Sequence, residues 1–220
     1  GFPKFKKKKE CKSIGFQRLL FRNNQFILEK WGAVNIFKNR LPEGKLKTAS
    51  IVKKADGYYL HVQAEYNHIN TNENQVGIDM GIKYFAVTSD GQYFDNPKHF
   101  KQYEDKLRIE NRSLSRKVKY SKRWYKQVNR LARVYLKISR VRLDYLHKTS
   151  TELSKLYGIV FMEDLNIKGM SKNKNLSKHI LDCGWGIFKQ LMSYKSTVYL
   201  VDPKYTSQTC SSCGCKDGAN

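Results

Sequence analysis

Val76-Gly77-Ile78-Asp79-Met80-Gly81-Ile82-Lys83 is the stretch that decides the fold. Its first four residues read as a buried strand that ends in a carboxylate, and the flanking Gly77 and Gly81 leave room for a metal or a phosphate backbone to approach Asp79. A second apolar run, residues 159–162, is typical of a strand in the buried centre of a sheet, and Glu163 follows it at once. If the two strands are neighbours, both carboxylates meet at one place.

This pair of acids predicts a site for divalent metal. Mg²⁺ prefers carboxylate oxygens, and two ions about 3.5–4 Å apart can activate water and stabilise the leaving oxygen of a phosphodiester. Asp79 and Glu163 are therefore the candidate catalytic and Mg²⁺-binding residues. A strand-end acid alone is also compatible with a helix N-cap or a surface ion pair, and the spacing leaves those alternatives open.

The neighbouring segments predict further strands. Downstream, Tyr84 to Ser89 and Gln92 to Phe94 flank an Asp90-Gly91 turn signal, so residues 76–94 form a three-stranded meander. Upstream, residues 1 to 70 are β-rich. There a hairpin is expected from Thr48 to Val52, the Asp56-Gly57 turn and a return strand from Tyr58 to Tyr66 that alternates apolar and polar side chains.

Residues 97 to 157 change to a helical period, with apolar side chains every three or four residues. Between Lys98 and Lys148 there are 17 lysines and arginines against 4 acidic residues, a surplus of 13. Simple solvation of a helix face usually mixes both signs, so this surplus favours contact with phosphate. The expected nucleic-acid-binding residues are Lys122, Arg123, Lys126, Arg130, Arg133, Lys137 and Arg140.

The last third of the chain returns to short elements. Gly158 ends the helical stretch, and a lysine-containing loop follows the strand that carries Glu163. One helix is then expected to carry Ile180, Trp185, Phe188, Leu191 and Tyr194, and Val198 to Val201 is the last expected strand, stopped by Pro203.

The charge of the chain restricts its partners. Forty-two lysines and arginines against 19 acidic residues give a formal net charge of +23, which implies DNA, RNA or an anionic membrane. The sequence contains no run of 18 apolar residues that could span a bilayer, and its charge is spread over the chain rather than gathered in one anchoring patch. Nucleic acid is the favoured partner. Five cysteines, an odd number, do not resemble a disulfide framework, so a reducing cytoplasm is expected.

Three of these cysteines lie near the end of the chain. Cys210 and Cys213, two residues apart and followed by glycine, form half of a structural zinc site. Four ligands are needed, and Cys215 is an awkwardly spaced third. A redox role would need a helix N-terminus to lower the thiol pKa, which the surrounding serines and glycines do not supply. Cys183 is expected to be a small buried hydrophobe.

These motifs, in this order, closely resemble the OrfB/TnpB proteins of bacterial and archaeal insertion sequences, which are relatives of the type V CRISPR effectors. The resemblance covers nearly the whole chain. It rests on residues 76–83, 142–148, 161–166, Trp185-Gly186 and 203–214. It implies an α/β fold, an RNase H-like (RuvC) mixed sheet with long inserted basic helices. A partial wedge-like β-barrel is expected over residues 1–72, the nuclease over 73–203 with its insertion at about 97–157, and half of a zinc ribbon over 204–220.

The resemblance also implies the chemistry. A family member is an Mg²⁺-dependent DNA endonuclease directed by a guide RNA from the transposon end, with structural Zn²⁺ in its ribbon. Such a protein is expected in the cytoplasm, associated with the nucleoid, with no membrane or small-molecule partner. Asp79 and Glu163 match the first two catalytic carboxylates, and Cys210 and Cys213 match the first cysteine pair. The third carboxylate and second cysteine pair are expected beyond Asn220, so the chain is expected to be an interior piece, inactive alone.

Two other functions remain open. A degenerate or truncated copy would bind nucleic acid without cutting it. A transposase with a three-acid site would transfer strands, although a zinc ribbon that interrupts the nuclease fold disfavours this alternative.

Overall fold

The computed structural model describes residues 13–22, 25–36, 44–65 and 70–203. The chain divides into two compact units, each built from two separate segments. The first unit consists of residues 1–67 and 110–136, and the second of residues 68–109 and 137–220.

The β-strands of the first unit form two antiparallel three-stranded sheets, with the orders β1-β5-β6 and β2-β3-β4. The predicted hairpin is confirmed, because β5 and β6 pair up to Lys54 and Gly57 on either side of the turn. A small core lies among these strands and consists of Phe16, Leu19, Phe26, Leu28 and Ala49. The strands are β1 (Ser13–Phe16), β2 (Leu19–Arg22), β3 (Gln25–Leu28), β4 (Gly32–Val34), β5 (Lys45–Lys54) and β6 (Gly57–Glu65).

The second unit is built on a mixed five-stranded sheet, with the order β11-β10-β7-β8-β9. β7, β8 and β9 form the predicted antiparallel meander, whereas β10 runs parallel to both β7 and β11. The expected α/β class with a mixed sheet is therefore confirmed. The strands are β7 (Gln75–Met80), β8 (Tyr84–Thr88), β9 (Tyr93–Asp95), β10 (Ile159–Glu163) and β11 (Thr197–Val201).

Six helices occur among the described residues: α1 (His99–Gln102), α2 (Glu104–Ser115), α3 (Lys122–Leu156), α4 (Ile167–Met170), α5 (Ser177–Cys183) and α6 (Trp185–Ser193). None of them is long and apolar enough to cross a membrane. The helical character expected for residues 97–157 is confirmed. The single helix expected from Ile180 to Tyr194 is wrong, because Gly184 adopts φ 72° and separates α5 from α6. A Cβ at Gly184 would lie 3.2 Å from Leu146 Cδ1, so α3 approaches the break closely.

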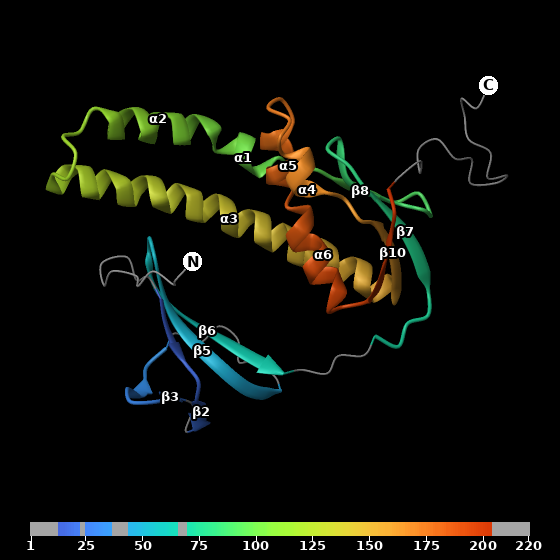
Figure 1. The fold of residues 1–220 in the computed structure, drawn as a ribbon, viewed down its shortest axis with the longest axis horizontal. Helices are drawn as coiled ribbons and strands as arrows, with labels where there is room; N and C mark the ends of the chain where they lie inside the picture. The colour runs from blue at the N-terminus through green and yellow to red at the C-terminus, as the bar shows by residue number, and fades with distance from the viewer. Residues whose placement is uncertain (1–12, 23–24, 37–43, 66–69, 204–220) are drawn as a thin grey trace, which may run out of the picture. The chain divides into compact units, whose positions relative to one another are not determined.

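Helices cover one face of the five-stranded sheet. Apolar side chains of β7 and β10 pack in one core with side chains from α3 and α6, and Figure 1 shows these helices beside the strands. The residues of this face are Val76, Ile78, Met80, Val160 and Met162 from the strands, with Leu146, Leu153, Phe188 and Met192 from the helices. Successive side chains of a strand point to opposite faces. The residues between these apolar positions therefore lie on the other face of the sheet.

Three alternate asparagines fasten the start of β7 to the end of α3. The amides of Asn70, Asn72 and Asn74 donate to the carbonyls of Ser154 (2.7 Å) and of Leu156 (2.8 and 3.1 Å). These carbonyls belong to the last turn of α3, where a helix leaves its C=O groups without helical partners. We call the three residues the asparagine clamp. The carbonyl of Asn74 also accepts from the Gly158 and Ile159 amides (3.1 Å each) at the start of β10.

Candidate carboxylate site

Asp79 and Glu163 are carried by neighbouring parallel strands. β7 and β10 pair as far as Ile78 and Met162, and the next residue of each strand is one of the two acids. Ile78 and Met162 point into the core, so Asp79 and Glu163 point to the opposite face. Asp79 is exposed and Glu163 is half-buried. The structure therefore places both candidate carboxylates side by side on one face of a rigid sheet.

An open pocket of about 450 Å³ lies at this pair. It is lined by residues 77–79, 87–89, 161–163 and Val201, which come from β7, the end of β8, β10 and β11. The backbone around it is fixed on one side by Ser89. The Ser89 amide donates to the Gly77 carbonyl (2.8 Å), and the Gly77 amide donates to Ser89 Oγ (3.1 Å).

The two glycines near Asp79 differ in role. Gly77 lines the pocket. Gly81 does not line it, and a Cβ at Gly81 would lie 2.9 Å from the Tyr84 carbonyl oxygen. The Gly81 amide also donates to the Phe85 carbonyl (3.3 Å). Gly81 is therefore needed for the tight connection from β7 to β8, and the expectation that it leaves room for a ligand is wrong.

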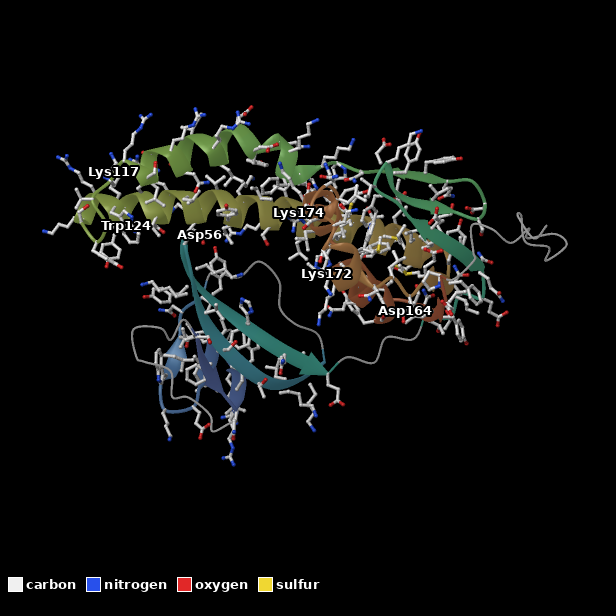
Figure 2. The ribbon with its side chains drawn as sticks, turned by 45° about the horizontal axis from the view of Figure 1, so that its top comes forward. Asp56, Lys117, Trp124, Asp164, Lys172 and Lys174 are labelled. Atoms are coloured by element: carbon white, nitrogen blue, oxygen red, sulfur yellow. The ribbon has the colours of Figure 1, made fainter. Side chains whose placement is uncertain are left out.

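The acid that follows Glu163 has a different partner. Asp164, labelled in Figure 2, has its Oδ1 2.7 Å from Lys189 Nζ of α6, and its amide donates to the Val201 carbonyl. Asp164 does not line the pocket. Of these two consecutive acids, Glu163 therefore lines the pocket and Asp164 forms an ion pair.

A third acid near the sheet is also used internally. Asp90, in the turn between β8 and β9, accepts hydrogen bonds from the hydroxyls of Thr88 and Tyr157. The Thr88 hydrogen bond, followed by that of Tyr157, holds the pKa of Asp90 below its usual value, and Asp90 raises the pKa of Tyr157. These contacts fasten the meander to the residue that follows α3, so Asp90 has a structural role.

The donor set at the pocket fits a hard divalent cation. Asp79 and Glu163 offer carboxylate oxygens, which suit Mg²⁺ or Mn²⁺ better than softer metals. Within residues 13–22, 25–36, 44–65 and 70–203, no group of three or more His, Cys, Asp or Glu side chains gathers around one point. The described residues therefore supply two protein ligands to such a site and leave further coordination to other groups.

The seven basic residues expected to bind nucleic acid are all exposed on α3. Six of them follow one another at intervals of three or four residues and so share one helix face; they are Lys122, Lys126, Arg130, Arg133, Lys137 and Arg140. Val134 and Ile138, on another face of the helix, are buried. Arg133 has an internal contact as well, because its Nε donates to the Ala55 carbonyl (3.3 Å).

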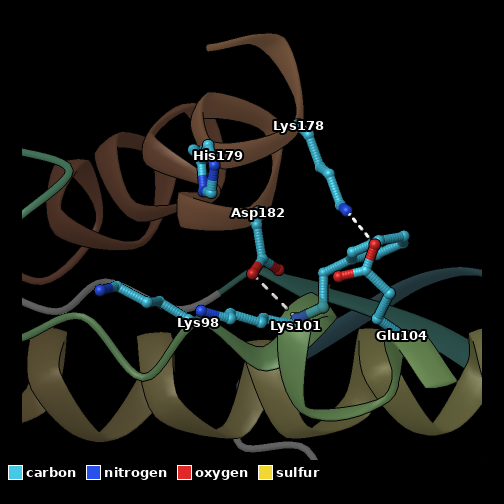
Figure 3. Close-up of a pocket in the computed structure, with 7 residues that line it drawn as sticks. Lys98, Lys101, Glu104, Lys178, His179 and Asp182 are labelled. Atoms are coloured by element: carbon cyan, nitrogen blue, oxygen red, sulfur yellow. Dashed lines mark hydrogen bonds and ion pairs between the residues drawn. The ribbon is translucent and has the colours of Figure 1, made fainter. Parts of the chain in front are cut away.

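A second pocket, of about 270 Å³, lies between α1, the start of α2 and α5 (Figure 3). Both of its acids are engaged: Glu104 pairs with Lys178, and Asp182 accepts from the Phe100 amide (2.8 Å) and pairs with Arg142 (3.0 Å). This pocket therefore offers no carboxylate pair of the kind found at Asp79 and Glu163.

Cys183 behaves as expected for a small buried residue. It is 3% exposed, and its Sγ lies 3.3 Å from the Asn96 amide nitrogen. Burial raises the pKa of its thiol to about 11. Cys210, Cys213 and Cys215 lie outside the described residues, so the zinc site stays a prediction.

Two features of the pocket were not anticipated. Ser89 lines it and fixes the backbone of Gly77, although a serine after a strand carries no distinctive sequence signal. Phe161 also lines it and stacks on Tyr199 of β11, with 5.4 Å between ring centroids and 20° between planes. Because Phe161 stands two residues before Glu163 in the expected strand, the period of a strand could have placed it on the face of Glu163.

Comparison with known proteins identifies the class to which this fold and site belong. Residues 59–174, more than half of the chain, match the OrfB_IS605 family, described as "Probable transposase". The chain belongs to this family. Residues 185–220 match the "Cas12f1-like, TNB domain" family.

Individual relatives are consistent with that assignment. The chain is 31% identical over 97% of its length to "Putative RNA-guided DNA endonuclease InsQ" of Escherichia coli (strain K12), and covers 60% of that protein. It is also 31% identical, over 97% of its length, to a "Putative RNA-guided DNA endonuclease" of Streptomyces pristinaespiralis, and covers 57% of it. It is 38% identical over 44% of its length to "TnpB-like protein MJ1635" of Methanocaldococcus jannaschii, covering 23% of that protein. The chain thus spans about three fifths of the length of the first two relatives.

Among solved structures, the chain is similar to one described as "Cryo-EM structure of the Cas12f1-sgRNA-target DNA complex". The TM-score is 0.41 at 16% identity, with 93% of this chain and 56% of that chain covered.

Proposed function

We propose that this chain is part of an RNA-guided, metal-dependent DNA endonuclease with an RNase H-like (RuvC) active site. The observation that carries the proposal is the placement of Asp79 and Glu163 on adjacent parallel strands, on the same face and at the same pocket. The names of the relatives support the activity and the guide. A guide RNA would supply sequence choice through base pairing, while the protein holds the duplex by charge and shape.

Asp79 and Glu163 would hold Mg²⁺ in this nuclease. The metal, when bound, supplies activation of water and stabilisation of the leaving oxygen of the phosphodiester. The contribution of the chain is to present two carboxylates from strands, which are more rigid than loops. The exposed cations of α3 would bind the phosphates of the nucleic acid, and this binding would weaken as the salt concentration rises.

The remaining assignments follow the same proposal. Residues 1–72 would be the C-terminal part of a wedge-like β-barrel, residues 73–203 the nuclease with its helical insertion at about 97–157, and residues 204–220 half of a zinc ribbon. Cys210 and Cys213 would bind structural Zn²⁺.

The test is cleavage of target DNA by the full-length protein with its guide RNA and Mg²⁺. Asp79→Asn is expected to lower the cleavage rate by more than about 100-fold, because the substitution removes a charged metal ligand. Asp164→Asn is the matched control, since Asp164 lies next to the pocket but pairs with Lys189, and it is expected to cut at nearly the normal rate. Equal cleavage by Asp79→Asn and the unchanged protein would refute the assignment.

The same experiment separates cutting from binding alone. A protein that binds guide and target but does not cut at any Mg²⁺ or Mn²⁺ concentration is a binding protein, and the endonuclease proposal then fails. A cutting protein whose activity disappears on chelation and returns with Mg²⁺ is the expected result.

A further inference from the structure

Residues 116–126, which join α2 to α3, combine basic and aromatic side chains. Six of these eleven residues are lysine or arginine and none is acidic. The segment also contains Tyr120, Trp124 and Tyr125. Figure 2 labels Lys117 and Trp124 at this end of the two helices. We call residues 116–126 the hairpin tip; it lies within the first unit.

The three aromatic rings of the hairpin tip form one cluster. The ring centroids of Tyr120 and Trp124 are 5.6 Å apart, and those of Trp124 and Tyr125 are 5.1 Å apart. Trp124 is half-buried between the two tyrosines, whereas Tyr120 is 74% exposed and Tyr125 is 56% exposed. Aromatic side chains in a core would be covered, so this cluster leaves two large rings available to a partner.

The backbone of the hairpin tip is held in place. Ser121 immediately precedes α3: its Oγ accepts from the Trp124 amide (3.1 Å), and its carbonyl accepts from the Tyr125 amide (3.0 Å). Tyr120 adopts φ 65°, a conformation that is uncommon outside glycine and costs free energy. One turn into α3, the buried Gln127 side chain donates to the Glu110 carbonyl of α2 (3.1 Å). The rings are thus presented by a fixed scaffold, which lowers the entropy lost on binding.

We propose that the hairpin tip binds single-stranded nucleic acid by stacking unpaired bases on Tyr120 and Tyr125. Cations alone would suit any polyanion, and a duplex hides the faces of its bases. Exposed aromatic rings among cations are the combination that binds single strands, where each base offers a face and each phosphate a charge. The inference rests on the nucleic-acid partner of the proposed function, but it does not require cleavage.

The first test uses the unchanged 220-residue chain and fluorescence anisotropy of labelled oligonucleotides of about 12 nucleotides. The probes are oligo(U), oligo(dT), an abasic strand with the same number of phosphates, and a duplex. Oligo(U) or oligo(dT) is expected to bind about tenfold or more tightly than the abasic strand, because only the bases differ. Equal affinity for the abasic strand would overturn the proposal. The ratio of the RNA and DNA affinities identifies which strand is preferred.

The second test locates the bases on the hairpin tip. Tyr120→Ser and Tyr125→Ser are each expected to weaken oligo(dT) binding by about tenfold without changing its salt dependence, since stacking releases no counterions. Lys122→Gln is expected to lower the slope of log affinity against log salt by about 0.7. Tyr135→Ser is the matched control, because Tyr135 is 49% exposed on the same helix but lies outside the hairpin tip. An equal loss with Tyr135→Ser would place the bases elsewhere and overturn the proposal.

A spectroscopic measurement guards against misfolded variants. In a Trp31→Phe background the remaining tryptophans are Trp124 and the buried Trp185. Oligo(dT) is expected to quench the fluorescence of this protein and the abasic strand is not. Quenching that is the same for both strands contradicts stacking. These readouts are binding and fluorescence, not cleavage. The proposal for the hairpin tip can therefore be refuted while Asp79→Asn still abolishes cleavage, and the endonuclease proposal can be refuted while the hairpin tip still binds single strands.

Discussion

Asp164 and Lys189 form an ion pair, with 2.7 Å between Oδ1 and Nζ, and this pair directs the acid next to Glu163 towards α6. Glu163 itself lines the pocket that Asp79 shares. Adjacent carboxylates on one strand end therefore have different surroundings, which makes them a natural pair of matched variants.

The first prediction concerns metal binding without catalysis. Mg²⁺ at about ten times its dissociation constant stabilises a one-site protein by about 1.4 kcal/mol, which raises the melting temperature of a chain of this size by about 3–6 °C. We expect this rise for the unchanged chain and for Asp164→Asn, and little or none for Glu163→Gln. Differential scanning fluorimetry with and without Mg²⁺ measures it. A normal rise in Glu163→Gln would show that the metal binds elsewhere.

The second prediction concerns the largely buried ion pair between Arg142 and Asp182. The Asp182 side chain is 10% exposed and also accepts from the Phe100 amide. Asp182→Ala is expected to lower the free energy of unfolding by roughly 3–5 kcal/mol, because it leaves a buried guanidinium and a backbone amide without their acceptor. Urea unfolding measures the loss. The control is Asp144→Ala, which breaks the exposed pair with Lys148 and is expected to cost less than about 1 kcal/mol. Similar losses in the two variants would contradict the structure.

The third prediction concerns the asparagine clamp. A Cβ at Gly158 would overlap the carbonyl oxygen of Asn72, so Gly158→Ala must displace the backbone that the clamp holds. We expect the free energy of unfolding to fall by about 2–4 kcal/mol. Gly15→Ala in β1 is the control, because its Cβ would meet nothing within 4 Å, and a change within about 0.5 kcal/mol is expected. An unaffected Gly158→Ala in urea unfolding would show that this packing is wrong.

The fourth prediction concerns the Cys183 thiol. Burial raises the pKa of this thiol from its ordinary value of 9.0 to about 11, so in that pH range the folded state keeps the proton that the unfolded state loses. This contribution is fully present below about pH 9 and is lost as the pH rises towards 11. Unfolding free energies measured between these limits are expected to fall more steeply for the unchanged chain than for Cys183→Ala. Parallel pH profiles would contradict the assignment.

Much of the fold could be predicted because its signals are local. The hairpin of β5 and β6 and the meander of β7 to β9 are marked by alternation and by Asp-Gly turns. The break at Gly184 could not be predicted in the same way. Gly184 adopts the left-handed conformation in which glycine often ends a helix, but the apolar spacing continues through it undisturbed, so spacing alone did not show the break.

The candidate site was predicted in part for similar reasons. Asp79 and Glu163 stand out because each follows apolar strand residues, but whether they share a face depends on the pairing of β7 with β10. The partner of Asp164 lies on α6, and the reason for Gly81 is a carbonyl three residues away. Such contacts depend on the tertiary structure, so composition and spacing alone did not distinguish a ligand from an ion pair.

The asparagine clamp has a consequence for the alignment of the two acids. In a sheet, a slip of one residue between neighbouring strands turns every side chain of one strand to the opposite face. Because Asn74 binds the amides at the start of β10 while its own side chain holds the end of α3, β7 and β10 begin from a common fixed point. Four residues later this fixed start brings Asp79 opposite Glu163 rather than opposite a core residue. The alignment of the pair is thus set where the two strands begin, by the backbone and side chain of Asn74.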